Sequence, residues 1–115
     1  MFDIYSMECN EANPKYQEII KLNKMLTEAN IPHTIKRLMD GWQVCYPVDV
    51  VHDNCVMDAI EHFRSYGHEH DELEIMGLLT PKEEEDKPVL GYLTAEDVFE
   101  RIRKHYSGEW QYEQI

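Results

Sequence analysis

The chain has 115 residues, of which 43% are hydrophobic and 10% aromatic, and its formal net charge is −12. This length predicts a single domain, residues 1–115, and the composition is that of a chain that folds. No run approaches the ~18 apolar residues that cross a bilayer, and the first residues lack the pattern of a secretory signal. We therefore expect a cytoplasmic protein that does not bind membranes.

Negative charge is concentrated in residues 61–100, where twelve acidic residues stand against Arg64, Lys82 and Lys87. A surface of this sign repels phosphates, so we expect no direct binding to nucleic acid. It suits a basic groove on a protein partner. The simpler interpretation is a solvated surface that keeps the protein soluble.

The three cysteines, Cys9, Cys45 and Cys55, are odd in number and include no Cys-x-x-Cys pair. Free thiols in a reducing compartment fit this usage best. None of the three has a neighbouring base in the sequence that would mark it as a nucleophile.

The N-terminal part predicts a strand followed by a helix. Residues 2–7 alternate loosely and are rich in strand formers. Asn13 and Pro14 are typical of a helix start, and Asn30 can close the helix in the left-handed conformation before Pro32. The expected apolar face of this helix consists of Tyr16, Ile19, Ile20, Met25, Leu26 and Ala29.

A β-hairpin is predicted over residues 33–47. Asp40-Gly41 suits a two-residue type I′ turn, which would pair Met39 with Trp42. In that register nearly all large apolar side chains share one face, which amphipathic helices can cover.

Three further helices are expected. One begins at Asp53 or Asn54 and ends near Gly67, with a buried stripe of Val56, Ala59, Ile60 and Phe63. Thr80 and Thr94 each precede an acid by three residues and predict the starts of a short helix and a long one, the latter closed by Gly108.

Two segments keep open alternatives. Residues 73–79 favour a short helix slightly over a strand. The tail, residues 109–115, could dock on the body, pair with another copy of the chain, or fray.

These elements predict an α+β fold. We expect a small antiparallel sheet made of the hairpin 33–47, to which strand 2–7 can add, covered on one face by three or four helices.

The chemistry in the sequence favours binding over catalysis. The chain has no glycine-rich phosphate loop and no Gly-x-Ser-x-Gly. His68, His70 and Asp71 have generic spacing, and a solvated polar loop explains them better than a metal site. We expect no enzyme activity, no cofactor and no metal.

Two groups of residues are candidate binding sites. Arg64, Ser65, Tyr66, Gly67 and His68, with Arg37 reaching from the hairpin, could surround an anionic or nucleotide-like ligand. Alternatively, Tyr66 packs beside a helix end and Arg64 pairs with a nearby acid. The second group is the acidic block Glu83, Glu84, Glu85 and Asp86, which can mimic the spacing of phosphates toward a protein partner or form a solvated helix surface.

Three short motifs stand out in the second half of the chain: Ser65-Tyr66-Gly67, Leu73-Glu74-Ile75-Met76-Gly77 and Gly91-Tyr92-Leu93-Thr94-Ala95-Glu96-Asp97-Val98-Phe99. Through these motifs, roughly residues 40–106 resemble small uncharacterised phage and prophage accessory proteins of Firmicutes. The resemblance implies a mobile-element protein that acts in the cytoplasm of the host cell by binding. Such a protein would occlude a host or defence protein, or sequester a small nucleotide-like ligand, and a homo-oligomer is compatible with the second role.

Overall fold

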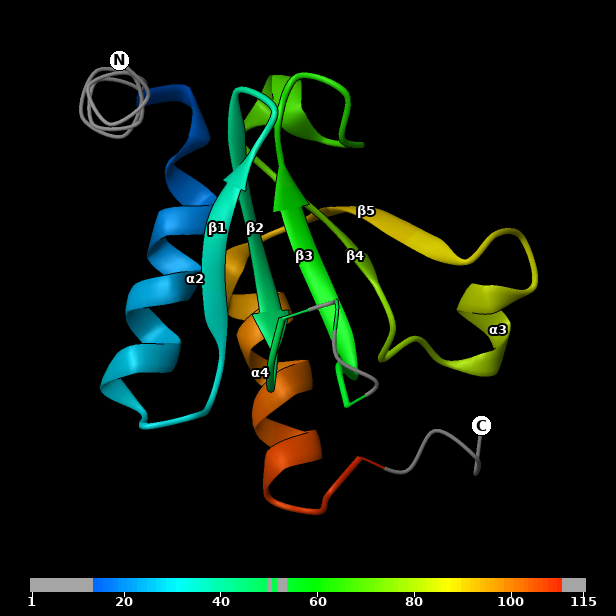
Figure 1. Cartoon of the computed structure of the whole chain (residues 1–115). Coiled ribbons are helices and arrows are strands. Elements are labelled where there is room, and N and C mark those ends of the chain that lie inside the picture. The colour runs from blue at the N-terminus through cyan, green and yellow to red at the C-terminus, as the bar shows by residue number, and fades with distance from the viewer. Residues whose placement is uncertain (1–13, 50, 52–53, 111–115) are drawn as a thin grey trace.

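The computed structural model describes residues 14–49, 51 and 54–110. Its elements, shown in Figure 1, are η1 (Pro14–Tyr16), α2 (Gln17–Glu28), β1 (Thr34–Leu38), β2 (Gly41–Tyr46), β3 (Met57–Glu61), η2 (His68–His70), β4 (Leu73–Met76), α3 (Pro81–Glu84), β5 (Val89–Leu93) and α4 (Ala95–Tyr106). No helix in these ranges is long and apolar enough to span a membrane.

The five strands form one antiparallel sheet in the order β1-β2-β3-β4-β5, so each strand pairs with its neighbour in sequence. Helix α2 contacts β2, β3 and α4, and α4 contacts β4, so both long helices pack on the same face of the sheet. Figure 1 is seen from the other side of the sheet, with α4 behind the strands. We call this other side, opposite the helices, the outer face.

The class is α+β as expected, but the prediction of a small sheet based on one hairpin is wrong, because the sheet has five strands. The main error is the helix predicted from residue 53 or 54 to Gly67. Residues 57–61 form β3, and burial alternates along it, with Met57, Ala59 and Glu61 buried. This period of two belongs to a strand, whereas the apolar residues alone suggested helical spacing.

Two other strands complete the correction. Residues 73–76 form β4, where a short helix was slightly favoured, and β5 at residues 89–93 was not expected at all. Both strands are short, and each is bounded on one side by a residue that interrupts regular structure. Gly77 follows β4, and Pro88 precedes β5. The predicted strand 2–7 and the cap Asn13 lie outside the described residues.

The hairpin forms with a different turn. Met39 and Asp40 are the turn residues, and Leu38 pairs with Gly41 and Arg37 with Trp42. Gly41 is the first residue of β2, and it lies so close to β3 that a side chain there would overlap the backbone carbonyl of Glu61. The pairing moves by two residues relative to the expectation, and a shift of two keeps the side chains of both strands on their predicted faces. Met39, predicted on the apolar face, instead lies in the turn and is 51% exposed.

The predicted helix signals of α3 and α4 are confirmed. The Thr80 and Thr94 side chains accept hydrogen bonds from the backbone N–H groups of Glu83 and Asp97, which return the bond as a capping box. The left-handed residue after α2 is Asn30, as expected, with φ 59°.

A continuous hydrophobic core lies between the sheet and the two long helices. Its buried members are Tyr16, Ile19, Leu22, Leu26, Ile31, Val44, Tyr46, Met57, Ala59, Leu73, Ile75, Leu78, Leu79, Ala95, Val98 and Ile102. Trp110 packs against this cluster, so the described start of the tail docks on the body.

Two carboxyl groups tie the N-terminus of α2 to the sheet. The backbone N–H of Ile19 donates to Oε1 of Glu61 at 3.1 Å. Those of Gln17 and Glu18 donate to Oδ1 of Asp71 at 3.0 and 3.1 Å. We call Glu61 and Asp71 the carboxyl junction. They satisfy backbone donors that a helix start leaves without partners.

Glu61 is fully buried within this junction. Burial raises the pKa of Glu61 to about 9, and the neighbouring Asp71 carboxylate adds to the shift. The side chain therefore carries a proton at neutral pH and meets Asp71 without a second negative charge.

Replacing Glu61 with glutamine is expected to flatten the pH dependence of stability. The ordinary pKa of this carboxyl is 4.5, so between pH 4.5 and 9 folded protein keeps a proton that the unfolded chain has released. The free energy of unfolding of the wild type then falls as the pH rises through this window. Relative to Glu61→Gln, it should fall by at least about 1 kcal/mol more between pH 5 and pH 8, since one pKa unit corresponds to about 1.4 kcal/mol.

Urea unfolding at a series of pH values measures this difference. Glu28→Gln, at the exposed C-terminal end of α2, is the matched control and should follow the wild type. Parallel pH profiles for the wild type and Glu61→Gln would show that Glu61 is ionised in the folded protein.

Candidate functional site

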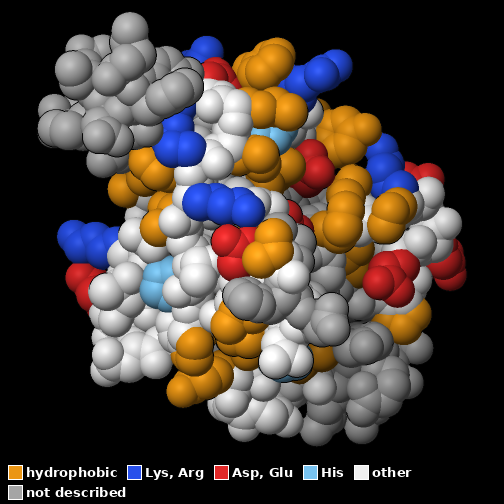
Figure 2. Space-filling model, viewed as in Figure 1, with side chains coloured by type: hydrophobic (Ala, Val, Ile, Leu, Met, Phe, Trp, Pro, Cys, Tyr) orange, Lys and Arg blue, Asp and Glu red, His pale blue; other side chains and the backbone are white. Residues whose placement is uncertain are grey.

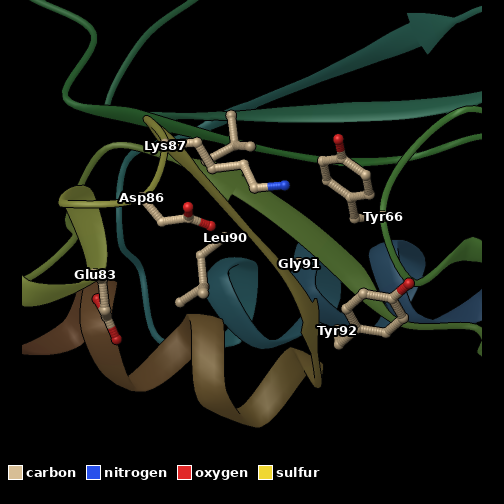
Figure 3. A pocket seen from close by; sticks show the side chains of 8 residues that line it. Tyr66, Glu83, Asp86, Lys87, Leu90, Gly91 and Tyr92 are labelled. Carbon is tan, nitrogen blue, oxygen red and sulfur yellow. The ribbon is translucent and has the colours of Figure 1, made fainter.

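A hollow of about 410 Å³ opens beside β5, which is an edge strand of the sheet. Figure 3 shows the side chains around it. They come from the turn after β3, from α3 and the segment that follows it, and from β5 itself. The lining residues are Tyr66, Glu83, Asp86, Lys87, Val89, Leu90, Gly91 and Tyr92.

The turn that carries Tyr66, residues 62–67, is built by short-range hydrogen bonds. The backbone N–H of His62 donates to Oγ of Ser65, and this hydroxyl donates back to the His62 carbonyl oxygen. The N–H of Tyr66 donates to Oε1 of Glu74 on β4 at 2.9 Å. At its other end the turn is fixed by Asp40, whose carboxylate accepts from the N–H of Phe63. The turn is therefore held on both sides.

Two glycines let this turn lie directly on β5. A side chain at Gly91 would overlap the Cβ of Tyr66. Gly67 has φ +101°, and a Cβ there would come within 3.0 Å of the Tyr92 nitrogen. The close approach brings the Tyr92 N–H to 3.4 Å from the Tyr66 carbonyl oxygen. The Tyr66 side chain is thereby placed at one side of the hollow.

A lysine and two tyrosines dominate the hollow. The Lys87 amine lies 4.5 Å from the centre of the Tyr66 ring, a cation–π distance, and Figure 3 shows it pointing toward that ring. Tyr66 is 45% exposed and Tyr92 55% exposed. Aromatic surface of this kind remains available to a further group.

The acids at the hollow differ in their surroundings. Arg101 of α4 donates to both carboxylate oxygens of Glu83, at 2.9 and 2.7 Å, and also to the Leu78 carbonyl oxygen. The hydrogen bond with Arg101 holds the pKa of Glu83 below its ordinary value. Asp86 is exposed to solvent. Glu83 thus anchors α3 to α4, and Asp86 presents a solvated charge.

Of the six residues predicted to bind a ligand, Tyr66 alone lines the hollow. Ser65 is buried and bonded within the turn. Arg64 is exposed, with its guanidinium 5.9 Å from the Phe63 ring centre. Gly67 is buried under Tyr92, and His68 begins η2. Arg37 lies on β1, the opposite edge of the sheet, so it does not join the others.

The predicted acidic block partly converges with Tyr66. Glu83 and Asp86 line the same hollow, while Glu84 and Glu85 are exposed and do not line it. The structure thus brings together one residue of the predicted ligand group and two of the predicted partner group. The two groups were assigned to separate functions from the sequence.

Sequence reasoning missed Lys87 and the residues of β5 as parts of a site. The sequence contained one signal, because the dipeptides Tyr66-Gly67 and Gly91-Tyr92 each join a glycine to a tyrosine. Both dipeptides belong to motifs that carry the resemblance to phage proteins. In the structure these two pairs lie against each other.

The outer face of the sheet adjoins the hollow. Because side chains alternate along strands, Ile60, Glu74, Met76 and Val89 point to this face, with Ile60 beside Glu74 and Met76 beside Val89. Met76 is 52% exposed. Figure 2 shows this side, where hydrophobic side chains gather in several clusters between charged ones.

Other reactive groups do not assemble into a centre. Among residues 14–49, 51 and 54–110, no three His, Cys, Asp or Glu side chains come together to hold a metal ion. Burial raises the pKa of the Cys55 thiol and lowers that of the His62 imidazole. A thiol with a raised pKa is a weak nucleophile at neutral pH.

Replacing Gly91 with alanine is expected to disturb the hollow. The added methyl group overlaps Tyr66, so the turn 62–67 must move off β5, at a cost of about 1–3 kcal/mol. Urea unfolding measures the cost, and hydrogen exchange at the Tyr92 amide reports the local change.

Gly108→Ala is the matched control, because an added Cβ there meets no atom within 4 Å. Its cost comes only from the left-handed backbone, and exchange at Tyr92 should stay as in the wild type. If Gly91→Ala is as stable as the wild type and exchanges equally slowly, the close contact of this turn with β5 is wrong.

No family model, no curated protein and no solved structure matches this chain.

Proposed function

We propose that this chain is a non-catalytic binding protein that covers a basic surface of a protein partner. The observation that carries the proposal is the outer face of the sheet, which no described helix covers and on which Met76 is 52% exposed. Exposed apolar side chains next to charged ones are typical of protein interaction sites.

The charge of the chain selects the kind of partner. The net charge is −12, Asp86 lines the hollow, and the exposed acids Glu84 and Glu85 directly precede Asp86 in the chain. An acidic surface speeds encounter with a basic protein and repels an acidic one. The apolar side chains of the outer face would supply the desolvated centre of the contact, and the acids its rim.

The resemblance to phage accessory proteins supplies a setting for this activity. In that setting the partner is a host protein that belongs to a bacterial defence system, and the chain acts in the cytoplasm of the infected cell. Occluding the partner's basic surface would inhibit it without any chemical step.

A second candidate function is the binding of a small nucleotide-like ligand. Tyr66, Tyr92 and Lys87 line one hollow, and aromatic rings with a nearby cation suit a base and a phosphate. The acids of the same hollow oppose a phosphate, so we rank this function below protein binding. This second function includes the case in which copies of the chain form a homo-oligomer and bind the ligand at their interface.

The proposal predicts which substitutions weaken binding to a partner. The tagged chain is expressed in the host, and a protein that co-purifies is identified by mass spectrometry and purified. Its affinity for the chain is then measured by calorimetry at several salt concentrations. Met76→Asp should weaken binding by about tenfold or more, because it places a charge in an apolar contact. Glu85→Lys should weaken binding and reduce its salt dependence.

Glu28→Lys is the control, because it makes the same charge reversal at an exposed position of α2. It should bind as the wild type does, and thermal unfolding shows that each variant is folded. Equal affinities of all variants would contradict the proposed surface. A nucleotide that raises the melting temperature, with no protein partner found, would favour the second candidate.

A further inference from the structure

We propose that the hollow beside β5 binds the side chain of a lysine or arginine of the protein partner, and that Lys87 fills this place in the free protein. The inference rests on the proposed function and names the chemistry of the contact. Partner binding would displace Lys87 from the Tyr66 ring.

The first support is that the hollow already holds a cation. The Lys87 amine lies 4.5 Å from the centre of the Tyr66 ring. Among the described residues it forms no ion pair. The ring, which is the electron-rich partner, is therefore its main contact. A second cation reaching the same ring face would make the same interaction.

The second support is the sign of the surrounding charge. Asp86 and Glu83 line the hollow, and Lys87 is the single base in its lining. Arg101 is engaged by Glu83 and by the Leu78 carbonyl oxygen. The Glu83 charge is balanced by Arg101. When Lys87 moves away, the Asp86 carboxylate and two tyrosine rings remain, which favours a cation over an anion.

The third support is the apolar part of the lining. Val89 and Leu90 contribute aliphatic surface to the hollow, and Tyr66 and Tyr92 contribute ring surface. Lysine and arginine carry a long aliphatic stem that packs on such surface while the charged end reaches polar groups. A compact inorganic cation would leave this surface unused.

Lys87 is suited to leave. It is exposed and stands in the segment between α3 and β5, outside any helix or strand. A single contact at an exposed site is weak, so a partner's side chain can replace it at small cost. Lys87 thus acts as an internal competitor that selects for partners able to supply a better-placed cation.

The test titrates small probes into the labelled protein and follows backbone amides by NMR. The probe is N-acetyl-lysine methylamide, with the uncharged N-acetyl-norleucine methylamide as its control and adenosine monophosphate as the anionic alternative. We expect the lysine probe to shift the amides of Gly91 and Tyr92 saturably, and the norleucine probe to leave them unchanged.

Lys87→Ala gives the decisive comparison, because the two ligand classes predict opposite results. Removal of the internal competitor should tighten binding of the lysine probe at least threefold. If the hollow binds a phosphate instead, Lys87→Ala weakens the binding of adenosine monophosphate, and the lysine probe does not bind. Lys82→Ala is the control, because it removes an equal charge at an exposed position of α3 that does not line the hollow. It should change the affinity for the lysine probe by less than a third of the change that Lys87→Ala produces.

Tyr66 is tested by a pair of variants. Tyr66→Leu keeps an apolar side chain and removes the ring, so binding of the lysine probe should be lost, whereas Tyr66→Phe keeps the ring and should retain it. Chemical shifts of residues on β1 and β2 confirm that each variant is folded. No saturable shift in the wild type or in Lys87→Ala, or equal effects of Lys87→Ala and Lys82→Ala, would overturn the inference.

The outcome is separable from that of the proposed function. A partner that binds through Met76 and Glu85, combined with no binding of the lysine probe, would refute the cation site alone. Saturable binding of the probe, with no protein partner affected by Met76→Asp, would refute the proposed outer-face contact and leave the cation site standing.

Discussion

The close contact between the turn 62–67 and β5 is the constraint on which the rest of the surface depends. It exists because Gly91 and Gly67 leave no side chain between the two backbones. The contact places a well-held turn against an edge strand, and edge strands that stay open invite pairing with other chains. The same contact fixes the Tyr66 ring above the hollow. The contact of the turn with β5 thus both protects the edge of the sheet and forms one side of the hollow.

Acidic residues have two distinct roles in this molecule. Glu61 and Asp71 face inward and receive the backbone N–H groups at the start of α2, and Glu18 does the same for Ala95 at the start of α4. At α2, whose N-cap residue Tyr16 makes no side-chain cap hydrogen bond, they take the place of a local cap, and at α4 Glu18 adds to the cap that Thr94 provides. The acids near residue 84 face outward and set the sign of the surface. Net charge alone cannot separate these roles, because burial decides between them.

The sequence predicted the parts that depend on local signals. The caps Thr80 and Thr94 and the end of α2 at Asn30 follow from side chains that act within a few residues. The strand β3 was missed because Glu61 occupies an inward position that an apolar residue usually fills. The hairpin turn was misplaced because Gly41 serves contact with β3. The hollow unites residues 25 positions apart, Tyr66 and Gly91, and no local pattern reports such contacts.

The most direct test of this account is the set of nuclear Overhauser contacts made by the Tyr66 side chain in solution. The geometry predicts contacts from the Tyr66 Hβ protons to Gly91 Hα. It also predicts contacts from the ring protons to the Hε protons of Lys87, whose resonance should lie upfield of its usual position because the amine sits over the ring. A Tyr66 side chain without contacts to either residue, together with an ordinary Lys87 Hε shift, would contradict the placement of the turn on β5 and the cation site built on it.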